Sequence, residues 1–464
     1  MKKLLLGSTA LAVGGLMAAP AMAADPIKMG VGGYYQFYAL AGGIEGTYAT
    51  NGTSVQFKGV QFIQEGEIHF IGQSKMDNGT TIGVRVELEA WNPATNTNGA
   101  TSGLVAGSSA RTIDEAYLFA FGDWGRVEFG AKDDAAYIMY YGAPSALLGF
   151  GFFQHNSSFS WTNPNANANN KAAFGISAQA IDAQYQDVNR INYYTPRFAG
   201  LQVGVGYAPK INLNSSATGG QGMGAGPNAN TGGVCGFNDA TTANGCPTND
   251  YSWQDALSIG ANYLNKFGDV SVAAYAAYSY MTFVPGYQPL AGAANQATGA
   301  NLASWKQMVF GLQGSYAGFT LGGSYGWDNN GMGSNYYTGV DNDTRKFALA
   351  LMYETGPWQL SAGWAQSYNT NGNGSVTITN CASGTSACAA TVATDQRVAF
   401  GNNPQAGALQ FGGETATKVE IGANYAIGPG VKMMGGLIYN NLQGPTNAVA
   451  AQSWAALLGM DFRF

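Results

Sequence analysis

The chain has few charged residues and few of the side chains on which most enzymes depend. Only 10% of its 464 residues are charged and just 2 are histidines, whereas about 25% of residues are charged in an average soluble domain. After the N-terminal segment it contains no uncharged apolar run near the roughly 18 residues that a membrane-spanning helix needs. We therefore do not expect a helical membrane protein. Because 12% of the residues are aromatic, we do not expect a disordered chain either.

Residues 1–23 have the pattern of an export signal. Lys2 and Lys3 form a short basic region, an apolar stretch follows, and Ala21-Met22-Ala23 supplies the small residues of a cleavage site. We predict that this segment is removed and that 24–464 form one mature domain. Loss of the two lysines leaves 19 basic against 27 acidic residues, a formal net charge of −8. Such an acidic chain is not expected to bind nucleic acid, which requires basic patches.

The four cysteines lie in two polar segments of low complexity. Cys235 and Cys246 share one stretch rich in Gly, Asn and Thr, and Cys381 and Cys388 share another. Because exported chains can retain disulfides, we predict one local bridge in each stretch. A four-cysteine metal site would need tight CxxC pairs, which the sequence lacks. We expect neither a metal nor a cofactor.

The dominant pattern in the rest of the chain is a period of two, which is typical of β-strands. Segments of roughly ten residues alternate apolar with small or polar side chains and end at turn residues. In the last segment one face carries Phe464, Phe462, Leu458 and Trp454, and the other carries Arg463, Asp461 and Gly459. Both a sheet packed on a core and a barrel with one face in lipid can produce this alternation.

Two further features favour a membrane barrel. Aromatic residues such as Tyr207 and Trp358 recur at the ends of the apolar faces, where amphipathic rings would meet lipid headgroups. Seven short turns rich in Gly or Asn also separate eight long segments, among them 41–58, 133–186 and 369–413. Outer-membrane barrels place short turns in the periplasm and long loops outside. We predict an all-β fold, a transmembrane antiparallel β-barrel of about sixteen strands.

Four blocks carry more specific information. They are the opening strand at 29–37, the paired segments at 116–130, the segment at 189–196, and the closing residues 461–464. In these blocks the chain resembles the trimeric general-diffusion porins of Gram-negative outer membranes. The resemblance implies an outer-membrane location, a homotrimer, and a terminal Phe464 that is read by the outer-membrane assembly machinery. It also implies that the third long loop, here 133–186, folds into the pore.

A pore needs no reaction, only a water-filled lumen with an electric field. Charged residues one position away from lipid-facing apolar residues must point into this lumen, because Arg or Lys on the lipid side costs ~2–4 kcal/mol at the membrane centre. The alternation assigns these inward side chains: Glu65, Glu67, His69, Arg85, Glu87, Glu89, Arg126, Glu128, Lys132, Arg190 and Asn192.

The resemblance further implies acidic loop residues that face basic wall residues across a narrow neck. Our candidates for this constriction are Arg85, Glu87, Arg126, Lys132, Asp133, Asp134 and Arg190. Opposed charges would orient water and favour small hydrophilic solutes over apolar ones. Family members commonly end the fifth strand with a Gly-Arg pair, whereas Gly130 is followed here by Ala131 and Lys132.

We therefore predict an outer-membrane porin for passive diffusion of ions and small hydrophilic solutes, without enzymatic activity. A hydrolase would have to use His69 or His155, and the chain has no GxSxG motif. Two alternatives stay open: a channel selective for one solute class, such as a sugar or an anion, and a surface interaction protein that acts through its loops. Conductance that saturates with one solute would favour the first alternative, and absence of conductance would favour the second.

Overall fold

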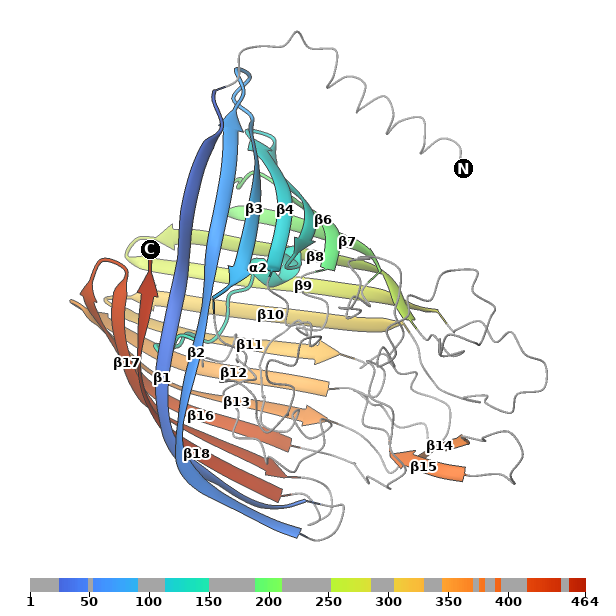
Figure 1. The fold of residues 1–464 in the computed structure, drawn as a ribbon, viewed down its shortest axis with the longest axis vertical. Coiled ribbons are helices and arrows are strands. Elements are labelled where there is room, and N and C mark those ends of the chain that lie inside the picture. The colour runs from blue at the N-terminus through green and yellow to red at the C-terminus, as the bar shows by residue number, and fades with distance from the viewer. Residues whose placement is uncertain are drawn as a thin grey trace.

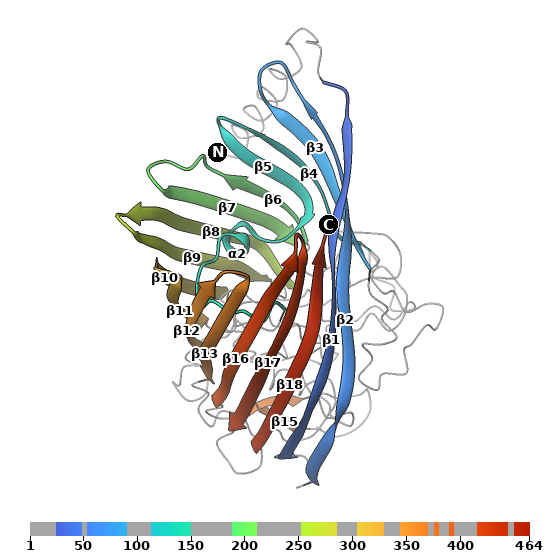
Figure 2. The ribbon, with the colours of Figure 1, turned by 90° about the vertical axis from the view of Figure 1, so that its left-hand side faces the viewer.

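The chain forms one closed antiparallel barrel in a computed structural model (Figures 1 and 2). The structure describes residues 25–48, 53–90, 113–149, 188–210, 252–284, 304–328, 344–369, 375–379, 389–393, 415–443 and 450–464. The barrel strands are β1 (Lys28–Tyr48), β2 (Thr53–Lys75), β3 (Thr81–Glu89), β4 (Ile113–Gly122), β5 (Gly125–Lys132), β6 (Val188–Tyr194), β7 (Leu201–Lys210), β8 (Ser252–Phe267), β9 (Val270–Val284), β10 (Trp305–Tyr316), β11 (Phe319–Asp328), β12 (Thr344–Thr355), β13 (Trp358–Asn369), β16 (Thr415–Gly428), β17 (Val431–Gln443) and β18 (Ala450–Arg463). Pairing of β1 with β18, from Tyr34↔Arg463 to Thr47↔Ala450, closes the sheet. The predicted all-β barrel of about sixteen strands is confirmed.

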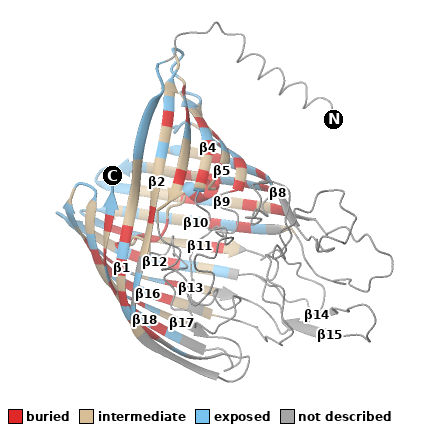
Figure 3. Cartoon of the chain, viewed as in Figure 1, coloured by how far each residue is buried: buried red, intermediate tan, exposed pale blue. Residues whose placement is uncertain are grey.

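Alternation of side chains along each strand gives the barrel an apolar outer surface. On β12, Phe347, Leu349 and Leu351 are exposed, while Ala348 and Ala350 between them are buried. Figure 3 shows this change from exposed to buried residues along the strands. Large apolar side chains outside and small ones inside are the arrangement expected of a barrel wall with lipid on its outer side.

Exposed aromatic side chains gather near the short turns. They include Trp124, Phe198, Phe267, Phe319 and Trp358, which lie within or directly beside the turns. This end of the barrel therefore carries the aromatic girdle that membrane barrels place at the lipid headgroups.

Positive backbone φ angles fix the short turns. In the hairpin from β10 to β11, Ala317 (φ 50°) and Gly318 (φ 85°) form the two-residue connection between the paired residues Tyr316 and Phe319. Two successive positive φ angles define a type I′ turn, whose twist matches that of the flanking strands. A Cβ at Gly318 would lie 2.6 Å from the carbonyl oxygen of Glu354, so glycine is required there.

The first hairpin is longer than the sequence indicated. We expected a loop at 41–58, but β1 and β2 stay paired without a break from Lys28↔Gln73 to Tyr48↔Thr53. The glycine-rich sequence suggested a loop, whereas in the structure glycine allows close packing of strands. A Cβ at Gly42 would lie 2.1 Å from the carbonyl oxygen of Trp454 on β18. The expectation of a loop over most of 41–58 was therefore wrong.

The segment 369–413, also expected as a loop, contains a second small sheet. Strands β14 (Ser375–Thr379) and β15 (Ala389–Ala393) pair with each other and are separate from the barrel. Runs such as Ser-Val-Thr-Ile-Thr are rich in β-branched residues, which favour strands. In the part of the chain that is described, no helix is long and apolar enough to cross a membrane.

The third loop folds into the barrel, as the resemblance implied. After β5 the chain forms the short helix α2 (Ala135–Ile138), which packs against the inner faces of β6 to β9 (Figure 2). Ala135, Ala136 and Tyr137 are buried in a cluster that includes Tyr275 of β9 and Val309 of the neighbouring β10. The described part of this loop thus lines one side of the lumen.

Candidate functional site

The inner faces of β2 to β5 carry a dense group of charged side chains, which we call the charged wall. Its members are Glu65, Glu67 and His69 on β2, Arg85, Glu87 and Glu89 on β3, Glu115 on β4, Arg126, Glu128 and Lys132 on β5, and Asp133 directly after β5. Val84 and Phe129, which alternate with these residues, are exposed on the outer surface. The inward assignment made from the sequence therefore agrees with the alternation of burial.

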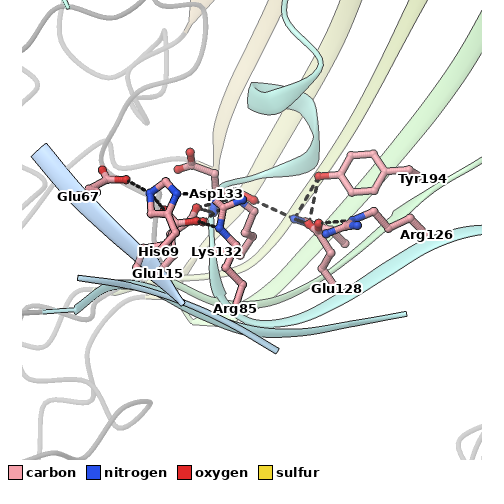
Figure 4. Close-up of polar contacts among 11 residues, drawn as sticks. Glu67, His69, Arg85, Glu115, Arg126, Glu128, Lys132, Asp133 and Tyr194 are labelled. Carbon is pink, nitrogen blue, oxygen red and sulfur yellow. Dashed lines mark hydrogen bonds and ion pairs between the residues drawn. The ribbon is translucent and has the colours of Figure 1, made fainter. Parts of the chain in front are cut away.

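His69 lies at the centre of a hydrogen-bond chain on this wall (Figure 4). Arg85 Nη2 lies 2.9 Å from His69 Nδ1, and His69 Nε2 lies 2.8 Å from Glu67 Oε2. Tyr34 donates its hydroxyl proton to Glu67 Oε1 at 3.0 Å. Arg85 also pairs with Glu87 at 2.5 Å. Side chains from three strands are thereby linked into one polar network.

Glu67, His69 and Glu87 are the candidate metal ligands of the described residues, with ligand atoms that all lie within 4.8 Å of one another. A guanidinium can only donate hydrogen bonds, so Arg85 requires Nδ1 of His69 to accept. Nε2 then carries the ring proton and donates to Glu67. A metal ion at Nε2 would need the opposite tautomer beside a positive charge. These three residues therefore do not fit a resident metal in this arrangement.

Lys132 and Glu115 form the next pair along the wall. Lys132 Nζ lies 2.7 Å from both carboxylate oxygens of Glu115, and the backbone N–H of Asp133 donates to the same carboxylate at 2.9 Å. Burial, together with the negative charge of Glu115, raises the pKa of Asp133 to about 7. The start of the third loop is thus fixed to β4 through this carboxylate.

Arg126 and Glu128 form a third pair, 2.7 Å apart. The Arg126 guanidinium also lies over the ring of Phe119, 4.8 Å from its centre. Tyr194 donates to Glu128 at 3.4 Å (Figure 4). A cation on an aromatic face and a hydrogen-bonded carboxylate both keep these side chains in place on the wall.

Two of the predicted constriction residues are covered by the loop. Arg190 Nη1 lies 2.8 Å from Asp134 Oδ1, and both side chains are only 1% exposed. Ser258 donates to the same oxygen at 2.5 Å. The other carboxylate oxygen accepts from the backbone N–H of Ala136 at 3.0 Å, so Asp134 is the N-cap of α2. This pair holds the loop against β6 and β8 and does not face open water.

The loop then follows the inner wall from β8 to β1 through a series of hydrogen bonds that the sequence analysis did not foresee. These are Tyr275 Oη to Ala136 O (2.5 Å), Asn262 Nδ2 to Met139 O (3.1 Å), Gln313 Nε2 to Gly142 O (2.6 Å), Ala146 N to Ser361 Oγ (2.9 Å), Asn424 Nδ2 to Ala146 O (2.9 Å) and Tyr38 Oη to Leu148 O (2.9 Å). Neutral amides and hydroxyls that face inward on strands are the signal that could have found them.

Glycines on the same strands bring the loop close to the wall. A Cβ at Gly311 on β10 would lie 1.7 Å from the carbonyl oxygen of Tyr141, and one at Gly260 on β8 would lie 2.8 Å from Cα of Ala136. Side chains at these positions would displace the loop backbone. The path of the loop is therefore determined by where the wall lacks side chains as well as by hydrogen bonds.

Another ion pair covered by the loop lies on β16, and the sequence analysis did not identify it. Lys418 Nζ lies 3.1 Å from Glu420 Oε2, and neither side chain is exposed. Ser145 of the loop donates to the other oxygen of Glu420 at 2.5 Å. Because the two opposite charges lie side by side and away from water, the pair adds no net charge to the lumen.

Phe464 has a defined place at the closure of the barrel. Its backbone N–H donates to Gly33 O at 3.1 Å and its carbonyl accepts from Gly33 N–H at 3.0 Å, while its side chain is exposed. Other predicted residues cannot be placed: Cys235, Cys246, Cys381, Cys388 and the segment 1–23 lie outside the described residues.

The barrel with an inward-folded loop and a charged lumen matches a known family over most of the chain. A model of the family described as Gram-negative porin matches residues 7–444. The chain belongs to the Gram-negative porin family. It is an outer-membrane channel for passive diffusion of ions and small hydrophilic solutes, which confirms the predicted location and function. Membership of this family indicates a channel rather than an enzyme.

Solved structures of outer-membrane channels are similar in fold. The outer membrane channel DcaP of Acinetobacter baumannii has a TM-score of 0.52 and 10% identity, with 94% of this chain and 97% of that one covered. The anion-selective porin from Comamonas acidovorans has a TM-score of 0.49 and 14% identity, with 94% and 100% covered. At these identities the likeness extends to the fold alone. No protein with a curated description matches the chain.

Proposed function

We propose that ions and small solutes cross this porin along the charged wall, with Arg85, Glu87, Arg126, Lys132 and Asp133 at the constriction. What supports this proposal is a contrast in exposure. The side chains of Arg85 and Arg126 are 30% and 34% exposed. Glu87 and Lys132, which pair with neighbours on the same wall, are 7% and 12% exposed. The loop-covered pairs, by comparison, are almost fully buried. In this account Asp134 and Arg190, which we had also expected at the neck, act by holding the loop in position.

Charge reversal at the wall tests the proposed constriction. Lys132→Glu combined with Arg85→Glu should move the zero-current potential under a salt gradient toward stronger cation preference, because two positive charges beside the path become negative. Arg345→Glu, on the exposed outer face of β12, is the matched control and should leave the potential unchanged. An unchanged potential in the double variant would remove Arg85 and Lys132 from the neck. Conductance that rises without saturation as solute is added would support general diffusion over selective binding.

A homotrimer is the proposed assembly. On the outer face of β1 and β2, Tyr35 donates to Gln64 Oε1 at 2.6 Å, beside the exposed rings of Phe37 and Phe62. An amide on a lipid-facing surface is unfavourable, whereas at a protein interface its polar groups can be shared. Cross-linking of the detergent-solubilised protein should give a product of three chains. A product that stays at one chain under native conditions would contradict the proposal.

The proposed export route has three parts that can be tested separately. Mass spectrometry of the mature protein should give Ala24 as the first residue, and non-reducing peptide mapping should find Cys235 linked to Cys246 and Cys381 linked to Cys388. Deletion of Phe464 should reduce the amount of barrel that reaches the outer membrane, since we propose that the assembly machinery recognises this exposed terminal ring. Normal assembly of the deletion variant would contradict that role.

A further inference from the structure

We infer that the lumen contains a binding site for small aromatic carboxylates, formed by Arg126 on β5 and Phe121 on β4. The inference rests on the proposed path along the charged wall and adds a class of solute that binds on that path. Arg126 binds the carboxylate, and Phe121 contacts the aromatic ring of the solute. The site lies at the short-turn end of the barrel, because Arg126 is the second residue of β5 and Phe121 is its partner across the hairpin.

A row of aromatic side chains lies on the inner face of β4. Tyr117, Phe119 and Phe121 are spaced two residues apart, so they point to the same side of the sheet. The rings of Phe119 and Phe121 stack, with their centres 6.1 Å apart and an angle of 22° between their planes. Phe119 is buried, whereas Phe121 is 37% exposed. The row therefore ends in a ring that a solute at this end of the lumen can contact.

The guanidinium group of Arg126 lies over two rings of this row. Its central carbon is 4.8 Å from the centre of the Phe119 ring and 5.7 Å from the centre of the Phe121 ring. Aromatic faces attract a cation placed over them, so the two rings hold the guanidinium group in position. Because its side chain is still 34% exposed, Arg126 presents a fixed positive charge to the lumen directly beside the exposed ring.

The ion pair with Glu128 leaves the terminal nitrogens of Arg126 available. Arg126 donates to Glu128 Oε1 through Nε, at 2.7 Å. The other oxygen of Glu128 accepts from Asn192 Nδ2 at 3.3 Å and from the Tyr194 hydroxyl at 3.4 Å. Nη1 and Nη2 of Arg126 have no hydrogen-bond partner among the described residues. Figure 4 shows this group at the opposite end of the charged wall from His69.

This combination of groups matches one class of solute. Two neighbouring N–H donors of a guanidinium group fit the two oxygens of a carboxylate. The exposed ring of Phe121 offers an apolar surface beside these donors, and contacts between aromatic rings are favourable beyond the area that they bury. Benzoate uses both parts of the site. Acetate uses only the guanidinium group, and inorganic phosphate likewise has no apolar part to place against Phe121.

Arg463 on β18 provides a comparison within the same barrel. It also donates through Nε to a carboxylate two residues away, Asp461, at 3.0 Å, and its side chain is 59% exposed. Arg463 lies at the short-turn end as well, because the neighbouring Phe462 pairs with Val431 at the start of β17. In the described part of the chain, no aromatic ring lies under its guanidinium group. Arg463 thus has the charge and the pairing of Arg126 without the ring.

Single-channel recording in dilute potassium chloride, where charges are weakly screened, tests the site. Sodium benzoate should interrupt the open-channel current briefly, and the fraction of time spent in the interrupted state should saturate as benzoate is added. This fraction gives a half-saturating concentration. Sodium acetate should need a concentration roughly threefold to tenfold higher, because it lacks the ring. Benzyl alcohol, which has the ring but no charge, should leave the current unchanged.

Substitutions separate the contributions of the two residues. Arg126→Gln should raise the half-saturating benzoate concentration at least about tenfold, because a neutral amide cannot replace two charged donors. Arg126→Lys keeps the charge without the paired donors and should raise it about threefold. Phe121→Leu should raise the value for benzoate to that for acetate and leave the value for acetate unchanged. Arg463→Gln is the matched control and should change it less than about twofold, since β18 is five strands from β5, which exceeds a Debye length.

Each outcome decides a separate point. A wild-type current that benzoate does not interrupt would overturn the inference and leave the diffusion channel intact. Equal half-saturating concentrations in wild-type protein and Arg126→Gln, or equal effects of Arg126→Gln and Arg463→Gln, would also overturn it. Equal values for benzoate and acetate in wild-type protein would exclude Phe121 from the site. If Arg126→Gln fails to fold, Arg126→Lys and Phe121→Leu provide the comparison. Absence of any conductance from wild-type protein would instead count against the proposed function itself.

Discussion

Asp134 and Arg190, 56 residues apart in sequence, form an ion pair of 2.8 Å that is sealed from water where the third loop leaves β5. A buried pair contributes little net stability when it is intact, because desolvation offsets the attraction between the charges. Loss of one partner is costly, since the other charge remains buried. The pair thus fixes the loop in one place, and its removal should affect both folding and conduction.

Arg190→Met should lower the free energy of unfolding by about 3–5 kcal/mol, because it leaves the buried Asp134 carboxylate without its cationic partner. Thermal or urea unfolding in detergent micelles measures this loss. Adding Asp134→Asn to this variant removes the buried unpaired charge, keeps an N-cap for α2, and should recover most of the stability. Lys28→Met breaks an exposed pair with Asp25 and should cost about 0–1 kcal/mol. Equal losses for Arg190→Met and Lys28→Met would contradict the structural role of the buried pair.

Gly311→Ala should change the conductance of the open channel. The added Cβ would lie 1.7 Å from the carbonyl oxygen of Tyr141, so the loop has to move away from β10 and into the lumen. Single-channel steps should become smaller and noisier. Gly314→Ala on the same strand is the control, since a Cβ there meets nothing within 4 Å. The glycine-dependent path of the loop would be disproved by identical step sizes in the two variants.

Cation preference should rise with pH as Asp133 loses its proton. The pKa of this carboxyl is raised from 3.8 to about 7, so the folded protein holds the proton more tightly than the unfolded chain. Stability should therefore fall as pH rises from about 4 to about 7 and level off above that. The cation-to-anion permeability ratio, measured from about pH 5 to about pH 8, should increase as Asp133 ionises. Asp133→Asn should flatten the pH dependence of both the stability and this ratio. A wild-type ratio independent of pH would exclude Asp133 from the conduction path.

Ala317→Asn should stabilise the barrel. Ala317 has a positive φ in a type I′ turn, which costs an ordinary L-residue about 1 kcal/mol and Asn less. The melting temperature in detergent should rise by a few degrees. Gly318→Ala, at the next position of the same turn, should lower it because its Cβ would crowd the Glu354 carbonyl. A lower melting temperature for Ala317→Asn would mean that the turn does not have this geometry.

The strand positions could be predicted from the sequence because each strand must present one face to lipid and one to the lumen. The alternation of β12 and β18, and the glycines of the short turns, are local consequences of that requirement. The extension of β1 and β2 to Tyr48 and Thr53 was missed because glycine- and alanine-rich segments have no strong alternation. Only the pairing with β18 reveals why Gly42 is needed.

The site was partly predictable for the same reason. The inward residues of β2, β3 and β5 follow from alternation, so Arg85, Arg126 and Lys132 could be named in advance. The sequence could not show which charged residues pair with each other in the folded barrel. Asp134 finds Arg190 on β6, and Lys418 and Glu420 are covered by Ser145, because the loop takes a path set by glycines and neutral hydrogen-bonding side chains. In the sequence, these glycines and neutral polar residues cannot be distinguished from ordinary inward-facing residues in contact with water.

Planar-bilayer recording of the purified wild-type protein tests the central claim most directly. The barrel described above should insert from detergent and give discrete current steps whose size grows in proportion to the salt concentration, because ions pass through a water-filled lumen. Protein that folds into the same barrel but gives no current steps at any salt concentration would contradict the account.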